Sequence, residues 1–163
     1  EQYWRDNRLN MIHEGTHGIQ AQDLLGRKVL LEDGAGLRLL SQRIQATVER
    51  ALASGDARLA GWADSLTQAL QRVLQATQAA WSHADPARVL ANAVPYMQAF
   101  GHTVLAWTWL DVALSSRAST DANTGRMLAC QYFFHYELPK IGAWLEVAAR
   151  CDSTCADMPE SAF

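Results

Sequence analysis

The sequence has 163 residues, of which 49% are hydrophobic and 19% are charged, and its formal net charge is -3. This length and composition are typical of a globular domain that can bury its own core. No basic tract is present, which argues against a nucleic-acid partner, and no apolar run approaches the roughly 20 residues that span a bilayer.

The first part of the chain, residues 1–33, predicts two short helical pieces. Thr16 is a fair N-cap for a helix that begins near Gly18, and Gly26 interrupts the end of that helix. The polar, glycine-containing stretch "LEDGAG" at 31–36 then predicts a hinge. We therefore expect a boundary near residue 33, between this short segment and a separate domain over residues 34–163.

From Gly36 onward the apolar residues recur at helical spacing. The expected segments are 36–51, 59–82, 90–114 and 127–150. Breaks are predicted at 54–56, in a polar loop over 115–125, and at Pro95 and Pro139, while Asp85 and Pro86 form a good helix start. Four long amphipathic segments with short connections predict an all-α, up-down helical bundle preceded by a short helical segment.

Aromatic, histidine and cysteine residues are expected to be mainly structural. Trp107 and Trp109 cannot share one helical face, so we expect one in the core and the other at solvent or a partner. The core is expected to hold Trp62, Trp81, Trp144, Met97 and Met127, whereas His83, His102 and His135 show no partner at a suggestive spacing. Cys151 and Cys155 are expected to be free thiols in a loose tail. An odd count of three cysteines without a secretory signal favours a cytoplasmic location.

Residues 13–17, His-Glu-Gly-Thr-His, match the H-E-x-x-H pattern of zinc proteases. That site needs both histidines on one continuous helix and a third ligand. Gly15 and Gly18 favour a turn instead, and aspartate occupies position 23, where one class would carry a third histidine. A zinc hydrolase that uses His13, Glu14 and His17 is kept as an alternative.

The flanks of this motif support another interpretation. The stretch "YWRDNRLNMIHEGTHGIQAQDLLGRKV" resembles the C-terminal catalytic segment of acyl-CoA dehydrogenases, in its order of Arg-Asp, Arg, Ile-x-Glu-Gly-Thr, Ile-Gln and Leu-Leu-Gly-Arg. His13 departs from the tyrosine that the family often has there, and the pair after Thr16 varies within the family. The helical remainder looks like the extension of a longer subgroup, which includes the type acting on methylthiopropionyl-CoA.

The resemblance implies an α,β-desaturation of an acyl-CoA thioester with FAD as cofactor. By position, Glu14 would be the base that removes the α-proton, and Gly15 would bind the substrate carbonyl through its amide. Thr16, His17 and Gly18 would lie where the family contacts FAD. The usual electron acceptor would be an electron-transferring flavoprotein, and the complete enzyme would be a homo-oligomer.

Glu1 opens the sequence in what looks like the middle of a structured element, so we expect a fragment of a longer protein. The family's N-terminal helical domain and middle β-domain supply most of the flavin and acyl pockets, so we expect the isolated chain to bind no FAD. The main alternative function is a non-catalytic helical module that mediates oligomerisation.

Overall fold

The computed structural model describes residues 2–11, 16–83, 85–116 and 120–162, and these residues are almost wholly helical, with no strand among them. The α-helices are α1 (Gln2–Asn7), α2 (His17–Asp23), α3 (Leu31–Leu52), α4 (Ala57–Trp81), α5 (Pro86–Ala91), α6 (Ala93–Ser115), α7 (Asp121–Tyr132) and α8 (Ile141–Arg150). Short turns of other helix types are η1 (Arg8–Met11), η2 (Leu24–Lys28), η3 (Phe133–Glu137), η4 (Leu138–Lys140) and η5 (Glu160–Ala162). The predicted all-α bundle is confirmed.

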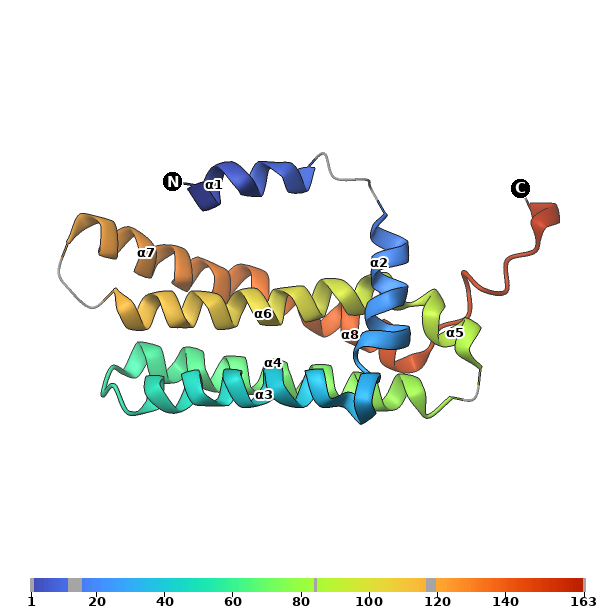
Figure 1. The fold of residues 1–163 in the computed structure, drawn as a ribbon, viewed down its shortest axis with the longest axis horizontal. Coiled ribbons are helices and arrows are strands. Elements are labelled where there is room, and N and C mark those ends of the chain that lie inside the picture. The colour runs from blue at the N-terminus through green and yellow to red at the C-terminus, as the bar shows by residue number, and fades with distance from the viewer. Residues whose placement is uncertain (1, 12–15, 84, 117–119, 163) are drawn as a thin grey trace.

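The long helices lie side by side along one axis, and α2 crosses them at a steep angle (Figure 1). Helices α4 and α6 are central, since α4 packs against α3, α6 and α8, and α6 also contacts α2, α3, α7 and α8. Their core side chains, Leu59, Leu66, Val73, Tyr96 and Leu110, are at most 1% exposed. None of the described helices has both the length and the apolar character that crossing a membrane requires.

The bundle core also contains a small polar network. The Tyr96 hydroxyl lies 2.6 Å from Thr77 Oγ1, which itself donates to the Val73 carbonyl at 2.8 Å. Because the Thr77 proton is already engaged, Tyr96 must be the donor of the pair. Burial raises the pKa of Tyr96 to about 12. Every buried side-chain nitrogen or oxygen in the described part of the chain has a hydrogen-bond partner.

The predicted helix start at Asp85 and the change at Pro139 are confirmed, whereas the break at Pro95 and the extent of the 115–125 loop are wrong. Asp85 caps α5 by accepting the Ala87 amide at 3.0 Å, and the fourth segment changes helix type around Pro139. Pro95 lies in the first turn of α6, where a proline is tolerated, because the break falls earlier, at Asn92. The loop predicted at 115–125 is shorter than expected, since α7 begins at Asp121 after an N-cap on Thr120.

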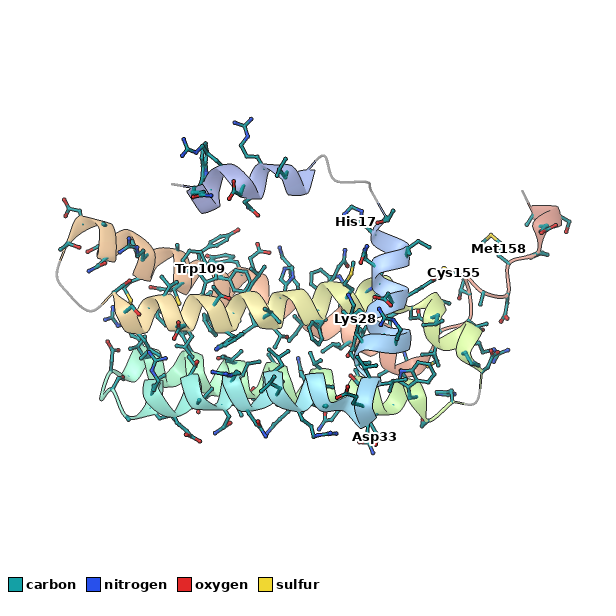
Figure 2. The ribbon with its side chains drawn as sticks, in the orientation of Figure 1. His17, Lys28, Asp33, Trp109, Cys155 and Met158 are labelled. Atoms are coloured by element: carbon teal, nitrogen blue, oxygen red, sulfur yellow. The ribbon has the colours of Figure 1, made fainter. Side chains whose placement is uncertain are left out.

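The two neighbouring tryptophans of α6 also differ from expectation. Both Trp107 and Trp109 are partly buried and pack against the core, so neither is left entirely to solvent. The Trp107 indole donates to Thr47 Oγ1 on α3 at 2.8 Å. Trp109 lies on the other side of α6, beside α7 (Figure 2).

The hinge predicted at 31–36 is present as a break within the first turns of α3. Glu32, Asp33 and Gly34 all have positive φ, at 50°, 55° and 81°. Such backbone favours glycine and is strained for the other two residues. The Arg38 guanidinium donates to the carbonyl oxygens of Asp33 and Glu32, which satisfies acceptors that the break exposes. The domain boundary near residue 33 stays a prediction.

Candidate functional site

The predicted site begins at the loop before α2. Glu14 and Gly15, the predicted base and carbonyl-binding residue, lie outside the described residues, as does His13. The predicted cofactor contacts Thr16, His17 and Gly18 are described, and together they form the start of α2. The structure therefore bears on the second half of the predicted site.

Thr16 is the N-cap of α2, as expected, but its side chain makes no capping hydrogen bond. Its carbonyl accepts the Gln20 amide at 2.9 Å, which is the first hydrogen bond of the helix. The amides before Gln20 have no acceptor within a regular helix. His17 and Gly18 are exposed, and the space around the Gly18 α-carbon is open. The first turn thus offers backbone donors and a partial positive charge to a polar or anionic group.

The C-terminal end of α2 together with the turn η2, which we call the foot of α2, is packed against the bundle, whereas the N-terminal end of α2, which we call its tip, is exposed. Ala21 and Leu25 are fully buried, whereas Ile19 is 65% exposed. The Trp81 indole of α4 donates to the Leu25 carbonyl at 3.1 Å, which ties the π turn η2 to the bundle. A Cβ on Gly26 would come within 3.1 Å of Leu90 Cδ2, so this glycine permits the close packing of η2 on α5. His17 therefore stands at the free end of an anchored helix (Figure 2).

An ion-pair group lies on the exposed side of this foot. Asp23 accepts from the Arg27 guanidinium at 2.6 Å and lies 3.2 Å from Lys28 Nζ. The Arg27 hydrogen bond, assisted by Lys28, lowers the pKa of Asp23. Exposed pairs of this type contribute little to stability, and we assign these residues no chemical role.

Of the three residues in the zinc alternative, the structure describes only His17, and its setting disfavours that alternative. Thr16 has φ of -84° and ψ of 37°, and α2 begins only at His17, so this helix does not extend back through the motif. The other two residues of the motif, His13 and Glu14, lie outside the described residues. His17 therefore lacks the helical setting that an H-E-x-x-H site needs.

The expectation for the two C-terminal cysteines is half wrong. Both are free thiols, and Cys155 is exposed, but Cys151 is buried. The Cys151 thiol lies 3.6 Å from the Ala80 carbonyl of α4 and 3.7 Å from the Ala148 carbonyl of α8. Its backbone, with φ of 49°, ends α8 in the left-handed conformation. This part of the chain is therefore packed against the bundle.

Sequence reasoning missed a polar and aromatic cluster between α6 and η3. His102 Nε2 lies 3.6 Å from Glu137 Oε2, and the rings of His102 and Trp144 make a T-shaped contact with centroids 4.8 Å apart. Lys140 Nζ donates to the same carboxylate at 2.6 Å and is the main cause of its lowered pKa. The Glu137–Lys140 spacing was visible in the sequence, but nothing in the sequence indicated that His102 comes from another helix to join them.

A hollow of about 540 Å³ lies beside the hinge, between α3 and α4. Its wall is mainly apolar, with Leu37, Leu74 and Trp81 among its residues, and Arg38 also contributes. Asp33 also lines the hollow, and the Arg38 guanidinium is engaged with the hinge carbonyls, so we assign the hollow no ligand. It was not foreseen, because it forms where two helices diverge at a backbone break.

Comparison with known proteins identifies relatives of most of the chain. Residues 40–159 match the model of a family described as acetyl-CoA dehydrogenase C-terminal like. The chain is 37% identical over 123 residues to 3-methylmercaptopropionyl-CoA dehydrogenase of Ruegeria pomeroyi, which covers 72% of the chain and 20% of that protein. It is 27% identical over 180 aligned positions to broad-specificity linear acyl-CoA dehydrogenase FadE5 of Mycobacterium tuberculosis, which covers all of the chain and 29% of that protein. The chain thus spans less than a third of each relative.

Proposed function

The chain belongs to the acetyl-CoA dehydrogenase C-terminal-like family, and from that premise we propose that it is the C-terminal part of a FAD-dependent acyl-CoA dehydrogenase. The observation that carries the proposal is the family match over 40–159, which includes most of the bundle. The names of both relatives support it, since each is an acyl-CoA dehydrogenase. The reaction of the complete protein would be the α,β-desaturation of an acyl-CoA thioester.

Glu14 is proposed as the general base. Its carboxylate would take the α-proton of the thioester, and the electrons of that C–H bond would form the new double bond. An α-proton of a thioester is a weak acid, so the carboxylate needs a dry surrounding that raises its basicity. We assign the Gly15 amide the role of donating to the thioester carbonyl oxygen, where negative charge develops. A residue without a Cβ lets the backbone approach the substrate closely.

Thr16, His17 and Gly18 are proposed as cofactor contacts. When bound, FAD accepts the hydride that leaves the β-carbon of the substrate. The first turn of α2 fits a polar or anionic part of such a cofactor, because its residues are exposed, its amides have no side-chain cap and Gly18 leaves room beside the backbone. Further partners in this proposal are an electron-transferring flavoprotein as acceptor and other subunits of a homo-oligomer.

The test is turnover of the complete protein with saturated acyl-CoA thioesters, measured as enoyl-CoA formed. We expect Glu14→Gln to lower kcat by about 10²- to 10⁴-fold, the usual contribution of a general base, with flavin content unchanged. Glu49→Gln, at an exposed position on α3, is the matched control and should retain full activity. Undiminished turnover in Glu14→Gln would rule out the assigned base. In a separate experiment, the isolated chain is mixed with FAD and passed through gel filtration, and we expect it to retain no flavin.

A further inference from the structure

Helix α6 is more apolar than its observed surroundings require. Residues 93–110 contain no Asp, Glu, Lys or Arg. A helix that lacks a charged face is normally covered on all sides. Several helices pack against α6, yet Leu105 in its middle remains 49% exposed. Part of α6 therefore has the composition of a buried helix, although no described residue covers it.

Two tyrosines extend this uncovered surface beside α6. Tyr132 and Tyr136 are 54% and 65% exposed, and their rings stack with centroids 5.0 Å apart. The Tyr132 hydroxyl donates to Glu137 Oε1 at 3.2 Å, which helps to hold the pair in place. Exposed aromatic rings held in a fixed arrangement are characteristic of interface cores rather than of free surface.

The tyrosines and the apolar strip of α6 belong to one face. His102 of α6 contacts the Phe133 ring at a centroid distance of 5.8 Å and lies near Glu137, so this side of α6 meets η3. Leu105 and Trp109 follow His102 by three and seven residues, which places them on the same side of the helix. We call Leu105, Trp109, Tyr132 and Tyr136 the α6–η3 face.

The position of α2 indicates what covers this face. Helix α2 packs by its foot on α6 and points away from the bundle on the side where α1 also lies (Figure 1). Its seven residues span only about 10 Å at 1.5 Å per residue. A folded domain tens of ångströms across that contacts the tip of α2 must also come close to the surface of α6. Exposed Trp4 and Ile19 add apolar side chains on α1 and α2.

We propose that the α6–η3 face is the docking surface for the flavin-binding body of the longer polypeptide. The proposal rests on the proposed function, because that body must hold FAD beside Thr16 and Gly18. Both relatives are longer than the chain, which spans 20% and 29% of their lengths, so each has additional sequence from which such a body could be built.

The test compares hydroxyl-radical oxidation of the isolated chain and of the complete protein. Tyr132 and Tyr136 should react in the isolated chain and be protected about fivefold or more in the complete protein, because an interface core excludes solvent. Leu39, 55% exposed on α3, is the control and should react equally in both. In parallel, Tyr136→Lys should leave the Tm of the isolated chain unchanged and lower that of the complete protein.

Four outcomes separate the alternatives. Equal tyrosine reactivity in a complete protein that binds flavin and desaturates acyl-CoA would overturn the docking surface and leave the function standing. Protection in a complete protein without flavin or activity would overturn the function and, with it, a flavin-binding body as the occupant of this face. Concentration-dependent protection of the isolated chain, with matching dimers in sedimentation, would assign the face to a second copy. Protection of the isolated chain by lipid vesicles would assign it to a membrane, and either of these last two results would overturn the proposal.

Discussion

Three helices of the bundle begin differently from α2, whereas α3, α6 and α8 lack a side-chain cap as α2 does. Helices α4, α5 and α7 each start after a loop with a side chain that accepts a backbone amide. The acceptors are Asp56 for the Arg58 amide at 2.9 Å, Asp85 for the Ala87 amide at 3.0 Å, and Thr120 for the Asn123 amide at 3.2 Å. Helix α2 starts at Thr16 without such a bond. The bundle thus satisfies some of its helix ends internally, while α2 leaves its first amides available.

Burial divides the two regions in the same way. The bundle encloses side chains such as Leu66 and Tyr96 completely. In α2 only the foot is enclosed, and the tip from His17 to Gln20 is exposed. The stable core and the proposed cofactor contacts therefore lie in different parts of the chain, and the foot of α2 joins them. This separation suits an element that must be held rigidly by one domain and present its end to another.

The strongest test of this comparison is truncation of one side chain in each region. Leu66→Ala should lower the free energy of unfolding by about 2–5 kcal/mol, because the cavity forms in a fully buried part of α4. Ile19→Ala removes a side chain that is 65% exposed at the tip of α2, and should change the free energy of unfolding by less than about 0.5 kcal/mol. Urea denaturation of the isolated chain measures both. A large loss in Ile19→Ala would show that the tip is packed.

The fold was predictable where its signals are local. The Asp85-Pro86 start, the break at 54–56 and the change at Pro139 all depend on residues next to them in sequence, so their positions could be read directly. The prediction of a loop over 115–125 was wrong from Asp121 onward for a related reason. Polar residues such as Asp121 and Thr124 resemble a loop in sequence but form the outer side of α7. The Thr120 cap and the burial of Cys130 decide the helix there.

The candidate site was predictable to a smaller extent. Glu14 was identified only through the resemblance of its flanks, and it stays a prediction, since it lies outside the described residues. His102 and Glu137 meet because two helices pack, and neither residue type nor spacing anticipates a contact between separate helices. The exposure of Leu105 is likewise a property of packing, since its sequence surroundings predict burial.

A smaller effect should lower the stability of the bundle at alkaline pH. Tyr96 has its pKa raised to about 12 by burial, and the buried Cys130 thiol likewise has a pKa of about 12. A raised pKa means that the folded chain holds the proton more tightly than the unfolded chain. The resulting stability is complete below the ordinary values of 10.0 and 9.0, and is lost as pH rises towards about 12.

Tyr96→Phe tests this expectation. At neutral pH the variant should lose about 1–2 kcal/mol, because Thr77 Oγ1 loses its donor in the core. Above pH 10 its unfolding free energy should fall less steeply than that of the parent chain, because one titrating group has been removed. Tyr136→Phe, at an exposed position, is the control and should keep the parent pH profile. Identical pH profiles for the Tyr96 variant and the parent chain would contradict the assignment.

The finest test compares two helix caps. Asp85→Ala should lower the free energy of unfolding by about 1 kcal/mol, because the Ala87 amide loses its acceptor at the start of α5. Thr16→Ala removes no capping bond and should change the free energy of unfolding by a few tenths of a kcal/mol at most. Urea denaturation of the isolated chain measures both. Equal losses of stability would mean that Thr16 caps α2, and the first-turn amides would then not be free for a cofactor. A loss confined to Asp85→Ala would show that the first turn of α2 has no side-chain cap, unlike that of α5.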